Sequence, residues 1–506
     1  MNAPRNASVA LKDSAVKLTQ GNLPQIDVRV KRPAYDRAAI ESGIVHLGLG
    51  GFHRAHMARY THDLMQADFA AARAWGIAGV GLLPGDRKMQ DSLQPQDCLY
   101  TLVDREGDEE NVAVIGAIKE IIFAGESTAA ALDAIGRAST KIVSLTVTEN
   151  GYCLNGVTKK LDPEHPSIKQ DLATPSNPRS AIGVIVEAYR RRRDGNAPAF
   201  TALSCDNIQH NGNVLREAVL TLAAMQEPAL ASWIEKNASF PNTMVDRITP
   251  VTKPQDIAYL ETQYGLADEW PVVCESFTQW VIEDKFVAGR PAWEKVGAQF
   301  VPDVTPYEVM KLRLLNASHS AIACLGDMAG YVTIDETMAN PLFQRFMAAL
   351  MDRETGPTLA PVPGIDLPAY KKKLIARFAN PAIKDTVERV ATDAPLNTVL
   401  ASIGDRLKAG QSVDLLSLAL AGWLRRARGV DEKGAAFKVR HPLADLLKAK
   451  AIEGGSDPMP LLSIDQLFGD LRHDERLTKP LAKHLASLYE IGSLATLEKA
   501  AAELSF

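Results

Sequence analysis

The chain has 506 residues, of which 46% are hydrophobic and 23% are charged, and its formal net charge is −5. This length allows about two to four domains, each large enough for its own core. The acidic balance argues against nonspecific nucleic-acid binding, which needs a basic face. No apolar run reaches the roughly 18 residues of a membrane-spanning helix.

The N-terminus and the cysteines indicate the cellular setting. The first twenty residues lack the apolar core of a signal peptide, so we expect a cytoplasmic protein. Five widely spaced cysteines without a CxxC pair predict reduced, buried thiols rather than a disulfide framework or a zinc site. We expect no metal, no nucleic-acid or membrane partner, and a monomer.

The first part of the chain alternates between strand and helix patterns. Apolar runs predict strands at 44–47, 77–82, 112–115, 142–147 and 199–204. Helical segments are predicted at 55–67, 127–137 and 181–193. Strands interleaved with helices indicate a mainly parallel sheet with helices on both faces.

After about residue 300 the pattern changes to helical periodicity. We predict helices at 306–325, 341–351, 369–378 and 415–426, with further helical segments through to about residue 497. The segment 235–300 is ambiguous. The simplest division is an α/β cofactor domain followed by a mostly helical domain, joined at Asp303-Val304-Thr305-Pro306.

A glycine-rich turn follows the first strand. Gly48 permits a tight turn, and Gly50 lets the backbone approach a pyrophosphate at a helix N-terminus. The usual third glycine position holds His53, so the dinucleotide-binding fingerprint is incomplete. An ordinary strand–helix turn is the alternative.

The end of the second strand bears on the choice of cofactor. An acidic residue there binds the ribose hydroxyls of the adenosine, and Asp86 is the candidate. It repels a 2′-phosphate and favours NAD, whereas the neighbouring Arg87 and Lys88 could accept a phosphate. We expect NAD, and NADP stays open.

Three further polar sites stand out, two of them directly after predicted strands. Asn207 lies at a strand's carboxyl end, where its amide could donate to a developing negative charge; a simple loop is the alternative. Asp246 and Arg247 place an acid beside a base, which a salt-bridged loop also explains. Thr148 could line the nicotinamide pocket or belong to a turn.

The stretch 305–319 predicts a helix whose polar residues share one face. At about 100° per residue, Lys311, Asn316 and His319 fall at about 0°, 140° and 80° around the axis. Glu308 falls near 60°, and leucines share the arc. A lysine in partly apolar surroundings becomes a proton acceptor near neutral pH. The pattern therefore predicts a catalytic lysine with hydrogen-bonding assistants.

Individual residues of this stretch have plainer explanations. Thr305 fits an N-cap with Glu308 at the third helical position, as in a capping box. A lone lysine is most often a surface residue, and a lone histidine is more often structural than catalytic. The hypothesis depends on the cluster.

Four motifs together resemble the polyol-specific long-chain dehydrogenases. They are Gly48-Leu-Gly-Gly-Phe-His-Arg-Ala-His56, Cys205-Asp-Asn-Ile-Gln-His-Asn-Gly212, Met244-Val-Asp-Arg-Ile-Thr-Pro250 and Lys311-x5-Asn316-x2-His319. The resemblance runs from about residue 40 to at least residue 395. It implies a Rossmann-type N-terminal domain, 1–300, and a mostly α-helical C-terminal domain, 301–506.

The resemblance also implies a metal-independent oxidation of a secondary alcohol with NAD. Lys311 is then the general base, and the amides of Asn207 and Asn316 form an oxyanion hole. His319 and Asp246 hold substrate hydroxyls or orient the lysine. A glutamate at the position of Glu308 helps protons move between the lysine and solvent. Gly48, Gly50, Gly51, Phe52, Asp86, Arg87 and Thr148 are the expected cofactor-binding residues.

One departure from the family concerns the far end of the substrate. Arg389 matches a substrate-binding arginine of the family. Asn397, however, occupies a position where family members usually have a lysine, so the choice of polyol is open. Gly85 also occupies a position where family members often have a glutamate, which weakens the case against NADP.

D-Mannitol and D-fructose are the favoured substrate and product. D-Arabinitol dehydrogenase, a hexuronate reductase acting on fructuronate or tagaturonate, and a non-catalytic nucleotide-binding sensor are the alternatives.

Overall fold

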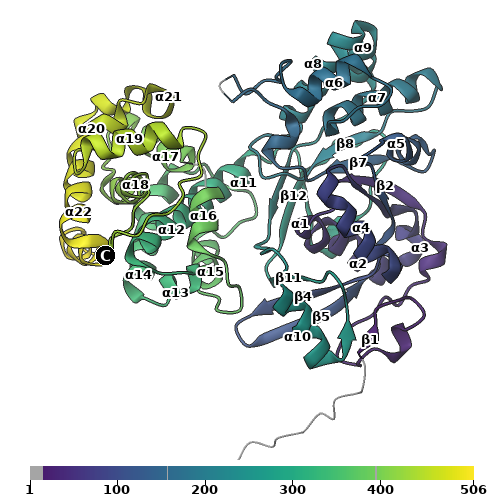
Figure 1. The fold of residues 1–506 in the computed structure, drawn as a ribbon, viewed down its shortest axis with the longest axis horizontal. Coiled ribbons are helices and arrows are strands. Elements are labelled where there is room, and N and C mark those ends of the chain that lie inside the picture. The colour runs from purple at the N-terminus through teal and green to yellow at the C-terminus, as the bar shows by residue number, and fades with distance from the viewer. Residues whose placement is uncertain (1–14, 157, 394–395) are drawn as a thin grey trace, which may run out of the picture. The chain divides into compact units, whose positions relative to one another are not determined.

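The computed structural model describes residues 15–156, 158–393 and 396–506. It divides into two compact units, Met1–Val304 and Thr305–Phe506 (Figure 1). Residues 1–14, which include most of the stretch inspected for a signal peptide, lie outside the described residues.

The first unit is built on a five-stranded parallel sheet with the order β6-β3-β2-β7-β8. The strands are β2 (Ser42–Leu47), β3 (Gly76–Gly81), β6 (Ile118–Phe123), β7 (Ile142–Leu145) and β8 (Thr201–Ser204). Four of them were predicted to within three residues at each end. β6, at one edge of the sheet, was missed.

Successive residues of a strand point to opposite faces of the sheet. Because apolar residues of these strands lie on both faces, helices cover both of them. Val45 and Leu47 belong to one hydrophobic core and Ile44 to another. The first core contains residues of α5 (Ala129–Gly136), α7 (Ala181–Asp194), α8 (Asn211–Gln226) and α9 (Pro228–Asn237). The second contains residues of α1 (Gly51–Ala55), α2 (Met57–Ala67), α3 (Phe69–Ala72) and α4 (Arg87–Leu93). The predicted α/β fold class is confirmed.

Smaller sheets complete the first unit. One has the order β11-β4-β5 and another the order β13-β12-β9, and β1 pairs with β10. Their strands are β1 (Val16–Lys17), β4 (Tyr100–Glu106), β5 (Glu109–Ile115), β9 (Thr243–Asp246), β10 (Leu266–Ala267), β11 (Val272–Glu275), β12 (Gln279–Glu283) and β13 (Gln299–Val301). The remaining helices are α6 (Pro166–Ala173) and α10 (Pro254–Tyr264). The ambiguous segment 235–300 therefore contributes the short strands β9 to β13 together with α10.

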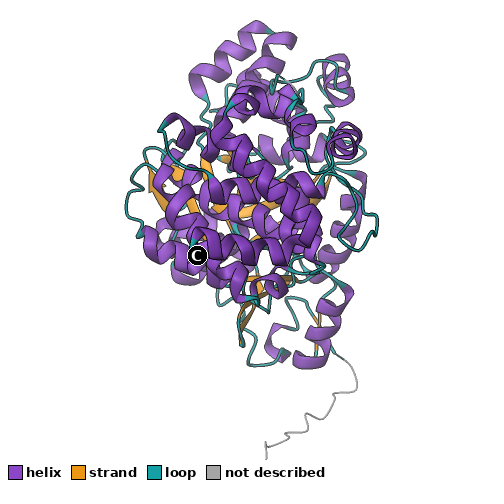
Figure 2. Ribbon diagram, turned by 90° about the vertical axis from the view of Figure 1, so that its left-hand side faces the viewer, coloured by secondary structure: helices purple, strands orange, loops and turns teal. Residues whose placement is uncertain are grey.

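The second unit consists of helices and loops, as predicted (Figure 2). It begins with α11 (Thr305–Met310), a π-helix (Lys311–Asn316) and α12 (Ala317–Ala329). Then follow α13 (Ile334–Met338), α14 (Pro341–Ala349), a second π-helix (Leu350–Thr355), α15 (Leu367–Phe378), α16 (Val387–Asp393), α17 (Asn397–Lys408) and α18 (Asp414–Arg426). The chain ends with α19 (Ala444–Gly454), α20 (Met459–Leu462), α21 (Asp465–Phe468) and α22 (Glu475–Leu504).

The last helix is bent at Gly492, whose φ of 78° and ψ of 174° are accessible to glycine but strained for other residues. The Glu432 carboxylate accepts hydrogen bonds from the Ser493 amide at 2.6 Å and from its hydroxyl at 2.5 Å. It therefore caps the helical segment after the bend. A β-carbon at Gly492 would lie 2.7 Å from a Glu432 oxygen.

Gly492→Ala should therefore lower the free energy of unfolding by about 1–3 kcal/mol, through backbone strain and displacement of Glu432. Urea denaturation measures the change. Gly404→Ala is the matched control, because Gly404 lies inside α17 with no atom within 4 Å of an added β-carbon. It should be neutral or stabilise by up to about 1 kcal/mol. Equal effects of the two substitutions would contradict the strain at the bend.

Candidate active site

The predicted cofactor residues follow the carboxyl ends of parallel strands. β3 and β7 flank β2 on opposite sides, so the strand order reverses beside β2. Open α/β sheets bind dinucleotides at such a reversal, outside the carboxyl ends of the strands. Gly48 follows β2, Asp86 follows β3, Thr148 follows β7 and Asn207 follows β8.

The glycine turn has the backbone geometry that its sequence predicts. Gly48 has a φ of +93°, and a β-carbon there would clash with the carbonyl oxygen of Thr146. Gly50 precedes α1 as its N-cap, with no atom within 4 Å of an added β-carbon. Gly51 begins the helix and Phe52 stacks on His56, with ring centroids 5.0 Å apart. The turn therefore offers the close backbone approach that a pyrophosphate needs.

His53, in place of the third glycine, is buried against a second histidine. Its ring stacks on that of His46 at a centroid distance of 3.4 Å. Burial lowers the pKa of His46 to about 3 and also lowers the pKa of His53. Both imidazoles are therefore neutral near pH 7. His46 bonds Ser144 at 2.8 Å and Thr146 at 2.9 Å, so the pair fixes the turn to β7.

The turn after β7 is strained and is held by a buried carboxylate. Thr148 has a φ of 60° and a ψ of 171°, a region in which essentially only glycine is unstrained. Asp206 accepts hydrogen bonds from the amides of Val147 at 3.2 Å and Thr148 at 2.8 Å. It also accepts one from the Tyr152 hydroxyl at 2.9 Å. These contacts keep Thr148 at the point where the strand order reverses.

Burial raises the pKa of Asp206 to about 6, although the Tyr152 hydroxyl and two amides oppose the shift. The ordinary value is about 3.9. Because folding raises this pKa, the carboxyl contributes stability below about pH 4 that is lost as the pH rises through about 6.

Asp206→Asn should remove this pH dependence. The stability of the native protein relative to the variant should fall by about 3 kcal/mol between about pH 4 and pH 7. Urea denaturation of both proteins across this range measures the difference. Tyr152→Phe removes a donor that lowers the pKa, so it should move the transition to higher pH. Parallel stability curves for native protein and Asp206→Asn would contradict the raised pKa.

Asn207 and Asp246, two predicted substrate-site residues, are connected through Asn211. Asn207 is exposed in the loop after β8, and Asp246 is buried at the end of β9. The buried Asn211 side chain accepts from the Thr243 amide at 2.9 Å and donates to the carbonyls of Asp206 and Thr243, both at 3.0 Å. The loop that carries Asn207 is therefore fixed to the strand that carries Asp246.

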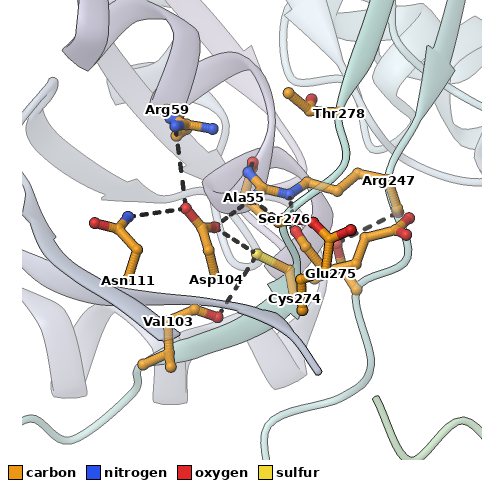
Figure 3. Close-up of polar contacts among 12 residues, drawn as sticks. Ala55, Arg59, Val103, Asp104, Asn111, Arg247, Cys274, Glu275, Ser276 and Thr278 are labelled. Carbon is orange, nitrogen blue, oxygen red and sulfur yellow. Dashed lines mark hydrogen bonds and ion pairs between the residues drawn. The ribbon is translucent and has the colours of Figure 1, made fainter. Parts of the chain in front are cut away.

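The side chain of Arg247, the residue after Asp246, is fully buried and joins three segments of the first unit (Figure 3). It donates to the Ala55 carbonyl at the end of α1 at 2.5 Å and to the Glu275 carbonyl on β11 at 2.9 and 3.0 Å. It also forms an ion pair with Asp104 on β4. The Glu275 carboxylate accepts from the Ile248 amide at 2.6 Å. These contacts fix the backbone on the carboxyl side of Asp246.

The second unit contains the lysine motif, and its geometry differs from the uniform α-helix assumed above. The Ala317 amide donates to the Leu312 carbonyl, five residues earlier, and residues 311–316 form a π-helix. Since π-helical bonds span five residues rather than four, Asn316 lies closer to Lys311 around the helix axis than it would in a regular α-helix. The predicted separation of about 140° between them is wrong, because an extra residue widens this turn.

The side chains of this helix are largely buried. Lys311 is 8% exposed, Asn316 6%, His319 8% and Glu308 4%. The His319 ring lies 4.4 Å from the ring of Phe378 at the end of α15. The π-helix and α12 therefore present an amine, an amide and an imidazole from one continuous helical segment.

The two predicted substrate-end residues lie on helices that pack against this segment. α16 packs on α12 and α17 packs on the π-helix. Arg389, on α16, pairs through two nitrogens with the carboxylate of Asp385, and the Nε–Oδ1 distance is 2.6 Å. Asn397 is exposed at the start of α17. Residues 394 and 395, just before it, lie outside the described part of the chain.

Sequence reasoning missed the residues that hold the site in place. Asp206 and Asn211 stand in the motif 205–212, but nothing local distinguishes them from loop residues. Arg247 was recognised as one member of an acid–base pair, yet its partner Asp104 lies 143 residues away. The strain at Thr148 carries no signal in the residue type.

Two family profiles together cover most of the chain. Residues 42–295 match the mannitol dehydrogenase Rossmann domain, and residues 303–489 match the mannitol dehydrogenase C-terminal domain. The chain belongs to the mannitol dehydrogenase family. The inferred resemblance to polyol-specific long-chain dehydrogenases is thereby confirmed, and so is the prediction that this protein is an oxidoreductase.

Members of the mannitol dehydrogenase family resemble the chain over nearly its whole length. Mannitol 2-dehydrogenase of Phaeosphaeria nodorum is 41% identical over 98% of this chain and 88% of its own. D-mannonate oxidoreductase of Escherichia coli is 45% identical over 90% of this chain and 93% of its own. The structure of Pseudomonas fluorescens mannitol 2-dehydrogenase with NAD and D-mannitol is 43% identical, with a TM-score of 0.87, over 96% of this chain and 100% of that one.

Three further observations concern the cysteines, metals and membranes. The five cysteines are buried free thiols, as predicted. In the described parts of this family member, no cluster of three or more His, Cys, Asp or Glu side chains is arranged to hold a metal ion. None of the helices described has both the length and the apolarity needed to span a membrane.

Proposed function

We propose that this protein is an NAD-dependent polyol dehydrogenase that oxidises D-mannitol to D-fructose without a metal. The observation that carries the proposal is the π-helix, which begins with Lys311 and ends with Asn316. π-Helical turns occur frequently at functional sites. The Pseudomonas fluorescens relative, 43% identical, is a mannitol 2-dehydrogenase whose structure was determined with NAD and D-mannitol.

In the proposed reaction, Lys311 Nζ accepts the proton of the substrate hydroxyl. NAD supplies the acceptor for the hydride that leaves the same carbon. The amides of Asn207 and Asn316 donate hydrogen bonds to the oxygen while it carries negative charge. His319 and Asp246 orient the substrate or the lysine, and Glu308 passes the proton from Lys311 toward solvent. Charge and protons balance, because the alcohol loses one proton and one hydride.

The residues proposed to bind NAD lie in the first unit. The glycine turn with Gly48, Gly50 and Gly51 receives the pyrophosphate, and Asp86 binds the adenosine ribose. Phe52, beside the glycine turn, also contacts the cofactor, and Thr148 borders the nicotinamide end. We accordingly propose 1–300 as the dinucleotide-binding domain and 301–506 as the domain that supplies the base.

A hexuronate reductase is the second candidate, because D-mannonate oxidoreductase of Escherichia coli is 45% identical to this chain. Binding the carboxylate of a sugar acid requires a basic side chain whose charge is not already neutralised by another acidic residue. Arg389 is paired with the Asp385 carboxylate, and Asn397, in place of the familiar lysine, adds no charge. Both features favour a neutral polyol over a sugar acid.

A substrate panel separates these candidates. Initial rates with D-mannitol, D-arabinitol, D-sorbitol, xylitol and D-mannonate, each with NAD and NADP, give kcat/KM for every pair. We expect D-mannitol with NAD to have the highest value. A higher value for D-mannonate would replace the proposal by the second candidate, and the absence of turnover with every substrate would support a nucleotide-binding sensor.

Chelation tests the metal-independent mechanism. EDTA should leave kcat unchanged, since the proposed base is an amine and the proposed oxyanion donors are amides. Activity is measured before and after dialysis against the chelator. Inhibition that added zinc reverses would contradict this part of the proposal.

A further inference from the structure

The adenosine end of the proposed cofactor site contains a cation that is already paired. Arg87 begins α4, directly after Asp86. Its guanidinium carbon lies 3.9 Å from the centroid of the Phe123 ring, and its Nη2 lies 3.1 Å from a carboxylate oxygen of Glu126. Phe123 ends β6, the strand beside β3, where it is paired with Gly81. The four residues therefore surround the carboxyl end of the second strand.

Each charged group here has a defined partner. One Asp86 oxygen accepts from the Leu83 amide at 2.9 Å, which fixes the carboxylate at the end of β3. The Lys88 ammonium lies 5.0 Å from the centroid of the Trp270 ring. Of the two basic residues that could serve a 2′-phosphate, Arg87 is thus the one directly opposed by a carboxylate.

The position of Glu126 is set by the backbone around it. Arg179 donates to the carbonyls of Gly125 at 3.2 Å and Glu126 at 2.9 Å. The Ala124 amide donates to the Gly81 carbonyl at 2.8 Å. The segment that carries Glu126 is therefore fixed to the end of β3, which keeps its backbone near Arg87. The side chain of Arg87 is 45% exposed and that of Glu126 is 81% exposed.

We propose that Glu126 determines cofactor preference together with Asp86, by neutralising Arg87 and so disfavouring the 2′-phosphate of NADP. An arginine near the ribose is the group that accommodates this phosphate. A carboxylate bonded to that arginine reduces its net charge and repels the incoming dianion. NAD, which has no 2′-phosphate, is largely indifferent to Glu126. This inference rests on the proposed use of a nicotinamide dinucleotide.

The test measures the binding of NADH and NADPH to the full-length protein by nucleotide fluorescence, without any polyol. Glu126→Gln should tighten NADPH binding about three- to tenfold and change NADH binding less than about twofold, since solvent-exposed charge pairs have modest energies. The gain should disappear in the Arg87→Gln background and shrink at high salt. Glu235→Gln is the matched control, because Glu235 pairs with Arg216 at 2.6 Å on the surface.

Several outcomes would overturn the inference. They are equal changes for both nucleotides, no change for NADPH, a gain that persists without Arg87, and a gain of the same size in Glu235→Gln. If the native protein bound neither nucleotide, both the proposed function and this inference would be refuted. Binding of NADH without an Arg87-dependent effect would overturn this inference alone.

Discussion

Lys311→Ala is expected to lower kcat for polyol oxidation by about 10³-fold, because a positioned general base contributes roughly 10²–10⁴ to the rate. The dissociation constant of NADH should stay within about twofold of the native value, since the proposed nucleotide contacts come from the first unit. Steady-state kinetics and fluorescence titration measure the two quantities. The separation of turnover from binding is what identifies a base rather than a structural residue.

Two further measurements make the result specific to the Lys311 amine. Small primary amines added to the variant should restore part of kcat, with a Brønsted dependence on the amine pKa. Lys479→Ala removes a lysine that is 73% exposed on α22 and should change nothing. Native turnover in Lys311→Ala, or an equal loss in Lys479→Ala, would refute the proposed mechanism.

The elements of the sheet were predictable because each depends on local pattern. The run 44–47 places apolar residues on both faces, with His46 as the exception, as expected for a central strand of a parallel sheet, and a glycine that needs a positive φ follows it. β6 was missed because Lys119 and Glu120 interrupt its apolar pattern. As an edge strand, β6 has a partly exposed side, and that is where polar residues are tolerated.

The geometry of the lysine helix was less predictable. The residue types at 308, 311, 316 and 319 indicated their chemistry, but helical periodicity assumes that every turn is α-helical. A π-turn inserts one residue into the helix and shifts the angular positions of the residues after it, and no residue type marks where this happens. The sequence therefore identifies the polar residues of this helix, and only the backbone shows that the π-turn brings Asn316 closer to Lys311 around the helix axis.

The contacts that support the site were unpredictable for a different reason. Asp206, Asn211 and Arg247 bond to groups tens to more than a hundred residues away in the chain. A single sequence contains no record of which distant carboxylate or carbonyl such a residue meets. Buried polar groups must nevertheless be paired, so their partners become evident once the fold brings the strands together.

Arg247→Met should be the most destabilising of these substitutions, lowering the free energy of unfolding by about 3–5 kcal/mol. The side chain of Arg247 is fully buried and that of Asp104 is 8% exposed, so removing the arginine leaves a buried carboxylate whose remaining ion pair, with Arg59, spans 4.0 Å. The carbonyls of Ala55 and Glu275 lose a donor as well. Urea denaturation measures the loss, and KM for the polyol should rise because Asp246 precedes the disrupted segment.

The double variant Arg247→Met/Asp104→Asn distinguishes the weakened compensation of the Asp104 charge from the loss of hydrogen bonds to the two carbonyls. Asparagine at 104 can still accept from Asn111, which now donates at 3.1 Å, but it carries no charge. If the buried carboxylate causes most of the loss, the double variant should be more stable than Arg247→Met alone. The surface control Arg73→Met removes an arginine that is 52% exposed and should cost less than about 1 kcal/mol. Additive losses in the double variant would show instead that Arg247 acts mainly through its bonds to the two carbonyls, which join α1 and β11 to the strand that carries Asp246.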